Sequence, residues 1–201
     1  DGIRDVAVTG VQDVCSSDLN ALRAGYDAIE HATFIDDEGL ELLLKRNVPV
    51  VPGLRFELMS IERGPQFGLS QRVIDGHQET LEGGAESCRK ILKAGGRLGM
   101  GGDYGFGWCP HGEYAKELSF FVNYVGFSPL DTLKCATKTG AEILGRGHEI
   151  GTLSPGKLAD VLVVEGDVVK NITLLEDRAN ILAVLQGGIV KAGRIIAPPT
   201  V

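Results

Sequence analysis

The sequence lacks several features that would identify broad classes of protein. In its 201 residues, no apolar run approaches the roughly 20 residues that a membrane-spanning helix needs, so no membrane association is expected. Basic residues are also few: 20 Lys and Arg stand against 27 Asp and Glu, giving a formal net charge of −7. Because nucleic acid is bound through basic patches that displace counterions, this acidity argues against a nucleic-acid partner.

Cysteine is scarce as well. The four cysteines are widely spaced and none forms a C-x-x-C pair, which favours reduced thiols over a disulfide framework. We therefore expect a cytoplasmic protein. The sequence starts at Asp1 rather than Met, so a signal peptide upstream of it is compatible with these observations.

Residues 8–19 stand apart from the rest of the chain. They read VTGVQDVCSSDL, the translation of a common short-read sequencing adapter once a single base is inserted after the codon for Gln12. The alternative is a genuine polar loop, since Ser, Asp and Gly are common in loops. Twelve consecutive matches favour the artefact, so Cys15 and Asp18 are given no function. Residues 1–19 then form the start of a fragment, and the missing Met and the adapter together suggest a metagenomic source.

From residue 20 onward, helical and strand-like segments alternate. Such a rhythm predicts parallel strands joined by crossover helices. The expected strands are residues 26–31, 48–54 and 97–103. The first expected helix ends at Ala24, and the second is amphipathic and capped at Asp36 or Asp37. The remaining expected helices are a long one from Ser70 to Lys93, one over residues 113–125 and one that begins at Ser128.

The pattern changes after Gly145. Residues 154–157 (SPGK) predict a turn, and residues 158–167 (LADVLVVEGD) predict a buried strand. Residues 181–193 (ILAVLQGGIVKAG) are typical of a hairpin with a Gly-Gly turn. We therefore expect this tail to form a β-layer of its own.

Two of the predicted parallel strands end in residues that can bind metal. His31 closes the first strand and Asp103 closes the last, and reactive side chains of parallel barrels lie at such carboxyl ends. Imidazole and carboxylate suit zinc and related divalent ions. Taken alone, this spacing also fits a structural histidine and an aspartate that belongs to a turn.

Longer motifs resemble the amidohydrolase superfamily, in particular its imidazolonepropionase and prolidase-like branch. The resemblance runs from Ala21 to Ile196. The motifs are IEHATFIDDEGLELLLKRNVPVVPGL, LKAGGRLGMGGDYGFGWCPHGEYAKEL, SPLDTLKCATKTGAEILG, EIGTLSPGKLADVLVVEGD and ILAVLQGGIVKAGR. It implies an α/β fold in which residues 20–148 are the C-terminal part of a TIM (β/α)8 barrel. Residues 149–201 would then be the C-terminal strands of a small composite β-sandwich domain.

The resemblance also implies a metal site and a mechanism. His31 resembles the metal ligand of the sixth strand, and Asp103 resembles the eighth-strand Asp, a metal ligand and catalytic base. The expected cofactor is a divalent ion, with zinc as the first choice and one or two ions in the full-length protein. Such an ion lowers the pKa of bound water toward 7. The aspartate can take that proton and deliver it to the leaving amine.

The loop after Asp103 supplies candidate substrate-binding residues. His111 fits either a substrate contact or a loop-ordering role, and Tyr104 fits either a hydrogen-bond donor or a packing residue. Phe106 and Trp108 would wall the site or cap the mouth of the barrel. Elsewhere, His77 and His148 are interpreted as structural or solvated, and Asp160 as a residue that pins a turn. The usual Gly-Thr-Asp of the last strand is Gly-Gly-Asp here, which removes any role for a Thr hydroxyl.

Several residues of the family pattern have no counterpart in the sequence. These are the first-strand His-x-His, the fourth-strand Lys and the fifth-strand His. Zinc normally needs three protein ligands plus water, so two ligands predict that this chain alone is inactive. An incomplete barrel would also leave an open strand edge, which favours aggregation.

The predicted function is metal-dependent hydrolysis of carbon–nitrogen bonds in a small-molecule or short-peptide substrate, and a homo-oligomer is compatible with it. The alternatives are a phosphotriester or lactone hydrolase using the same site, a non-catalytic barrel, and an unrelated TIM-barrel enzyme. The β-tail disfavours the last of these.

Overall fold

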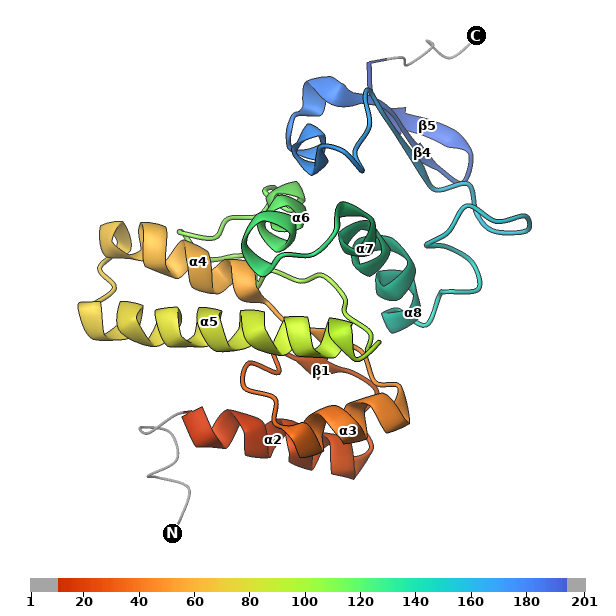
Figure 1. The fold of residues 1–201 in the computed structure, drawn as a ribbon. Coiled ribbons are helices and arrows are strands. Elements are labelled where there is room, and N and C mark those ends of the chain that lie inside the picture. The colour runs from red at the N-terminus through yellow and green to blue at the C-terminus, as the bar shows by residue number, and fades with distance from the viewer. Residues whose placement is uncertain (1–10, 195–201) are drawn as a thin grey trace, which may run out of the picture. The chain divides into compact units, whose positions relative to one another are not determined.

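The computed structural model describes residues 11–194, with side chains from residue 17 onward, and the chain divides into two compact units between Gly112 and Glu113 (Figure 1). Within the described residues, no helix combines the length and the apolar character that crossing a membrane requires. The prediction of a barrel part over residues 20–148 and a β-domain from residue 149 concerns the whole protein and stays a prediction.

The first unit alternates helices with very short strands. Its elements are α2 (Val11–Ala24), β1 (Ile29–Glu30), α3 (Asp37–Arg46), β2 (Val50–Val51), α4 (Leu54–Arg63), the 3-10 helix η1 (Gly64–Phe67) and α5 (Gln71–Lys93). The predicted alternation of helix and strand is confirmed, but the strands are much shorter than expected. Two residues pair in each, compared with six or seven in the expected segments.

The strands of this unit are parallel, as predicted. Strand β1 pairs in parallel with β2, and Val50 of β2 forms a parallel bridge to Leu98 on its other side. The Val50 N–H donates to the carbonyl of Arg97 at 2.9 Å, and the Val50 carbonyl accepts from the Gly99 N–H at 2.8 Å. Three parallel segments therefore lie side by side, and their carboxyl ends point to one edge.

Helix α3 has the predicted cap. The Asp36 carboxylate accepts a hydrogen bond from the Gly39 N–H at 2.7 Å, which satisfies one of the free donors at the helix start. Asn47 follows the last helical residue, and its φ of 55° is the left-handed conformation typical of a helix C-terminus. Its inner face buries Leu43.

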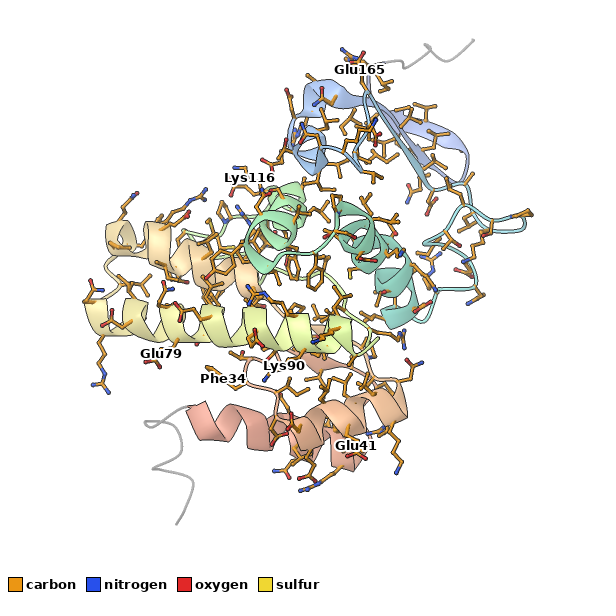
Figure 2. The ribbon with its side chains drawn as sticks, in the orientation of Figure 1. Phe34, Glu41, Glu79, Lys90, Lys116 and Glu165 are labelled. Atoms are coloured by element: carbon orange, nitrogen blue, oxygen red, sulfur yellow. The ribbon has the colours of Figure 1, made fainter. Side chains whose placement is uncertain are left out.

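Helix α4 was not predicted, and it packs along α5 (Figure 1). Two glycines of α5 let its neighbours approach closely. A Cβ added at Gly84 would lie 2.3 Å from Leu54 at the start of α4, and one at Gly83 would lie 2.1 Å from Phe34, which lies beside α5 (Figure 2). Helix α5 has the predicted limits, and Ser70 precedes it at the predicted cap position. The prediction that the Ser70 side chain caps the helix is wrong, because this side chain makes no capping hydrogen bond.

Helix α2 includes much of the stretch that matches the adapter. It spans Val11 to Ala24, and Gly25 follows with φ 100°, so the predicted helix end is confirmed. The alternative of a polar loop is wrong for residues 11–19, because this segment is helical; residues 8–10 lie outside the described residues. The adapter origin of residues 8–19 stays a prediction.

The second unit begins with α-helices that continue as wider π-helices. Helix α6 (Ala115–Phe120) continues as the π-helix η2 (Phe121–Val125), and α7 (Pro129–Lys134) continues as the π-helix η3 (Cys135–Thr139) and then α8 (Gly140–Ile143). Ser128 caps α7 as predicted, since its hydroxyl accepts from the Asp131 N–H at 3.1 Å.

An antiparallel sheet of three strands closes the second unit. Strand β3 (Val161–Val164) follows the predicted turn, the 3-10 turns η4 (Ile172–Glu176) and η5 (Arg178–Asn180) come next, and β4 (Ile181–Gln186) and β5 (Ile189–Ala192) form the predicted hairpin. Gly187 and Gly188 have φ of 57° and 81°, as a two-residue hairpin turn requires. Asp160 accepts from the Gly187 N–H at 2.7 Å, which confirms that it pins a turn.

The prediction that β3 is buried is wrong. Leu162 is 49% exposed and Val163 is 37% exposed. A strand becomes fully buried only when layers cover both faces of its sheet. Within residues 113–194, a single three-stranded sheet is described, so apolar side chains of β3 remain open to solvent.

Candidate functional site

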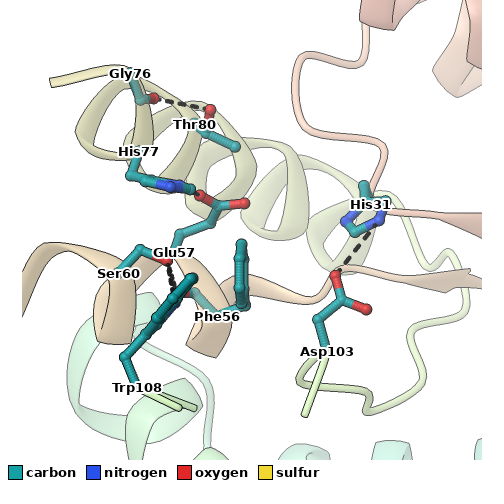
Figure 3. Close-up of polar contacts among 9 residues, drawn as sticks. All are labelled: His31, Phe56, Glu57, Ser60, Gly76, His77, Thr80, Asp103 and Trp108. Atoms are coloured by element: carbon teal, nitrogen blue, oxygen red, sulfur yellow. Dashed lines mark hydrogen bonds and ion pairs between the residues drawn. The ribbon is translucent and has the colours of Figure 1, made fainter. Parts of the chain in front are cut away.

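His31 and Asp103 face each other at the carboxyl ends of the parallel strands (Figure 3). His31 directly follows β1, and its N–H donates to the carbonyl of Val51 at 2.8 Å, which extends the pairing of β1 with β2. The imidazole Nε2 lies 3.6 Å from Oδ2 of Asp103, and both side chains are about half exposed. The structure therefore brings together the two residues that the sequence singles out as metal ligands.

Both residues have an uncommon backbone conformation. The φ angles of His31 and Asp103 are 71° and 47°, in the left-handed region, and Ala32 has φ 48°. For a residue other than glycine, such a conformation costs roughly 1–3 kcal/mol and persists only where the surroundings enforce it. Residues of this kind cluster at functional sites, so two of them at facing strand ends support a functional role.

Gly53 forms the floor between the two side chains. It precedes α4 with φ 58°, and a Cβ added there would lie 3.0 Å from Nδ1 of His31 and 3.3 Å from Oδ2 of Asp103. A side chain at this position would therefore crowd both candidate ligands and also strain the backbone. These contacts give a steric reason for glycine at position 53, which the sequence pattern alone did not reveal.

A buried hydroxyl of α5 holds the loop that follows His31. Ser87 donates to the carbonyl of Thr33 at 2.8 Å and accepts from the N–H of Ile35 at 3.1 Å. All three residues are buried. This pair of hydrogen bonds helps to fix the turn in which His31 and Ala32 have positive φ.

The donor set fits part of a metal site. An imidazole nitrogen and a carboxylate oxygen 3.6 Å apart, both half exposed, are the ligand types that zinc accepts. Within the described residues, no group of three or more His, Cys, Asp or Glu side chains is placed to hold a metal ion. His31 and Asp103 would therefore provide two ligands, and the others must come from outside residues 17–194.

A second pair of ionisable side chains lies next to this site, on α4 and α5. Nδ1 of His77 is 2.5 Å from Oε2 of Glu57, and both side chains are largely buried (Figure 3). Burial raises the pKa of Glu57, and the hydrogen bond from His77 opposes that rise. The prediction that His77 is structural or solvated did not identify this partner, because a contact between two helices has no signature in the local sequence.

The candidate substrate-binding residues lie on the loop after Asp103. The rings of Tyr104 and His111 have centroids 6.5 Å apart at an angle of 35°. His111 is exposed and Tyr104 is partly buried. This arrangement is compatible with either role proposed for each residue, so both assignments stay predictions.

An aromatic cluster of Phe56, Phe67, Phe106 and Trp108 lies between the loop and the start of α4. The closest rings are those of Phe56 and Phe106, with centroids 4.8 Å apart, and Phe106 lies 5.2 Å from Trp108. Trp108 donates its indole N–H to the Ser60 hydroxyl at 2.9 Å (Figure 3). The sequence suggested Phe106 and Trp108 as wall residues, whereas the contribution of Phe56 and Phe67 was missed.

Comparisons with known proteins identify the family of the chain. The sequence model of the Amidohydrolase family matches residues 8–190. An ochratoxinase of Aspergillus niger is 26% identical over 187 residues, covering 90% of this chain and 37% of that protein. An imidazolonepropionase of Symbiobacterium thermophilum is 29% identical over 154 residues, covering 74% of this chain and 31% of that protein.

Solved structures show the same relationship. A prolidase complexed with N-methylphosphonate-L-proline superposes with a TM-score of 0.78 at 25% identity, covering 91% of this chain and 43% of that chain. The ochratoxinase structure of A. niger gives a TM-score of 0.77 at 25% identity, with 90% and 40% covered. The chain thus spans less than half the length of these relatives, and its fold is of their TIM-barrel type. The family match over most of its length shows that this chain belongs to the amidohydrolase family.

Proposed function

We propose that this chain is the C-terminal part of a metal-dependent hydrolase that cleaves carbon–nitrogen bonds. The observation that carries the proposal is the approach of His31 and Asp103, with Nε2 and Oδ2 3.6 Å apart, at the carboxyl ends of parallel strands. Catalytic residues of TIM barrels lie at such ends. The general metal dependence of the amidohydrolase family supports the same assignment.

Each residue has a defined role in this proposal. His31, through its imidazole, and Asp103, through its carboxylate, would hold a divalent ion. When bound, such an ion, with zinc as the first choice, supplies an activated water and a polarised carbonyl. Asp103 accepts the proton of the attacking water and returns it to the leaving amine. Gly53 leaves the space in which both side chains can approach.

The proposed substrate is an amide in a small molecule or short peptide. The relatives in the comparisons are named ochratoxinase, imidazolonepropionase and prolidase. We assign Tyr104 and His111, on the loop that follows the proposed base, the role of contacting such a substrate.

The chain alone is proposed to be inactive. It covers 37% of the ochratoxinase to which it is similar, and its described residues supply two metal ligands. A catalytic zinc needs three protein ligands and one open position. The full-length protein, by contrast, would carry one or two metal ions and would act in the cytoplasm.

The test uses the full-length protein, expressed from a gene recovered from source DNA. Hydrolysis of Xaa-Pro dipeptides and N-acyl amino acids is measured before chelation, after chelation and after zinc is added back. We expect activity that disappears with chelation and returns with zinc, and that falls by at least about 1,000-fold in Asp103→Asn, because the proton transfer and a ligand are both lost. Full activity in the chelated enzyme would contradict the proposal.

A further inference from the structure

Helix α4 contacts the candidate site at two separate places. Its N-terminal neighbour Gly53 lies against both His31 and Asp103. Seven residues later, about 10 Å along the helix axis, Ser60 contacts the loop that follows Asp103. One helix with the residue before it therefore lies against the proposed base and also contacts the segment that continues from it.

The contact at Ser60 is a directed hydrogen bond. Nε1 of Trp108 lies 2.9 Å from Oγ of Ser60, which is completely buried. The Ser60 hydroxyl donates its single hydrogen to the carbonyl of Phe56 at 2.8 Å, so its oxygen is the acceptor for the indole N–H. Arg63, also on α4, donates to the carbonyl of Trp108 at 3.3 Å. Trp108 is thus bound to α4 through both its side chain and its backbone.

Trp108 is connected to Asp103 by a short, closed loop. The Gly105 N–H donates to the carbonyl of Cys109 at 2.9 Å, and the Cys109 N–H donates to the carbonyl of Phe106 at 3.0 Å. The buried Cys109 thiol lies 3.5 Å from the carbonyl of Gly102, the residue before Asp103. A shift of Trp108 would therefore be passed to the backbone of Asp103, whose φ of 47° depends on its surroundings.

We propose that Trp108 is a positioning residue, whose hydrogen bond to Ser60 holds the Asp103 loop in the conformation that directs the carboxylate toward His31. This inference rests on the proposed function, in which Asp103 transfers the proton. A purely packing role would depend on the ring alone, which touches Phe56, Phe67 and Phe106. The two roles differ in their dependence on the N–H group.

The test compares Trp108→Phe and Ser60→Ala in the full-length protein. The first variant keeps a ring and removes the donor, and the second removes the acceptor. Thr80→Val is the control for loss of a helix hydroxyl. Like Ser60, Thr80 donates to the carbonyl four residues earlier in its helix, that of Gly76 at 2.9 Å (Figure 3). The measurements are kcat and KM for the amide substrate, metal content, and amide hydrogen exchange of residues 103–109.

We expect kcat to fall roughly 10–100-fold in both variants, with KM within about twofold and metal content unchanged, since small displacements of a catalytic group have costs of this size. Hydrogen exchange in residues 103–109 should rise at least about tenfold in Ser60→Ala, and Thr80→Val should match the wild type. If Trp108→Phe does not fold, Ser60→Ala alone decides.

Two results overturn the inference. One is unchanged loop exchange in Ser60→Ala, which would refute the anchoring of the loop whatever the activity. The other is an unchanged kcat when the loop exchange has risen. A wild-type protein that hydrolyses no amide would instead refute the proposed function, while the exchange measurement would still decide whether Trp108 anchors the loop.

Discussion

His31 and Asp103 approach to 3.6 Å between Nε2 and Oδ2, and both residues have positive φ. Two separate segments of the chain thus adopt costly backbone conformations at the point where their side chains meet. Gly53 lies against both side chains, and Ser87 and Ser60 hold the loops that follow them. The described structure therefore holds together the two residues that we propose as metal ligands, and the proposed site requires further ligands.

Gly53→Ala should damage the site through its Cβ. The added carbon would lie 3.0 Å from Nδ1 of His31 and 3.3 Å from Oδ2 of Asp103. We expect zinc affinity of the full-length protein to fall roughly 10–100-fold, the range seen when groups that orient metal ligands are changed. Titration calorimetry with zinc measures this loss.

Gly68→Ala is the matched control for Gly53. Gly68 has φ 86°, and a Cβ added there meets no atom within 4 Å. Both variants therefore carry the backbone penalty of about 1 kcal/mol or more, but Gly68→Ala adds no contact with the ligands. Equal loss of zinc affinity in both variants would show that the close contacts of Gly53 with His31 and Asp103 play no part.

Asp18→Asn should stabilise the 201-residue chain at neutral and alkaline pH. Burial raises the pKa of Asp18 from 3.8 to about 6, and its Oδ2 has no hydrogen-bond partner among the described residues. Because the folded state binds the proton more tightly, this residue's contribution to stability is fully present below about pH 3.8 and is lost as pH rises through about 6. The neutral Asn avoids that loss.

We expect circular dichroism to show a rise in Tm of about 2–4 °C at pH 8 and none at pH 3.5. Because the carboxyl is only half buried, the change in the free energy of unfolding stays at about 1 kcal/mol. Asp27→Asn, at an exposed position of the following turn, should change Tm at neither pH. A gain at both pH values would rule out the ionisation argument. A buried acid without a partner agrees with the proposal that residues 8–19 are foreign to the fold.

Asp160→Ala should loosen the C-terminal hairpin. Its carboxylate accepts from the Gly187 N–H at 2.7 Å, and loss of such a bond costs about 0.5–1.5 kcal/mol. We expect faster hydrogen exchange at Gly187, whereas Asp160→Asn, which keeps an acceptor oxygen, should exchange at nearly the wild-type rate. Identical exchange in all three proteins would show that the turn forms without this bond.

Source DNA should lack the codons for residues 8–19. Sequencing across this junction is expected to place the native segment DGIRD, residues 1–5, shortly before the segment that begins at Asn20, and to reveal His-x-His, Lys and His codons upstream. If VTGVQDVCSSDL is encoded in genomic DNA, the adapter interpretation is wrong, and the helix α2 that contains residues 11–19 belongs to the native fold.

Local signals in the sequence predicted most of the secondary structure. The Asp36 and Ser128 caps, the limits of α5 and the Gly-Gly hairpin each depend on residues that are close in sequence. Helix α4 was missed because Pro52 and Gly53 precede it in place of a capping side chain, and together they are typical of a strand end. Tertiary contact with α5 compensates for the weak start.

The candidate site was predicted in part for the same reason. His31 and Asp103 could be found because each closes a segment with a strand-like sequence pattern, and parallel strands bring their carboxyl ends together. The Glu57–His77 pair and the Trp108–Ser60 bond join residues far apart in sequence, whose meeting depends on how α4, α5 and the loop pack. No local pattern specifies such pairs.

The most direct test is the zinc content and amide-hydrolysis rate of the full-length protein, measured in parallel for wild type, His31→Ala, Asp103→Asn and His148→Ala. His148 is the control, since its side chain is 75% exposed and lies in the second unit. We predict that wild type and His148→Ala bind one or two zinc ions and hydrolyse the amide, while His31→Ala loses bound zinc and both site variants lose the activity. Full zinc content and activity in His31→Ala and Asp103→Asn would contradict this prediction.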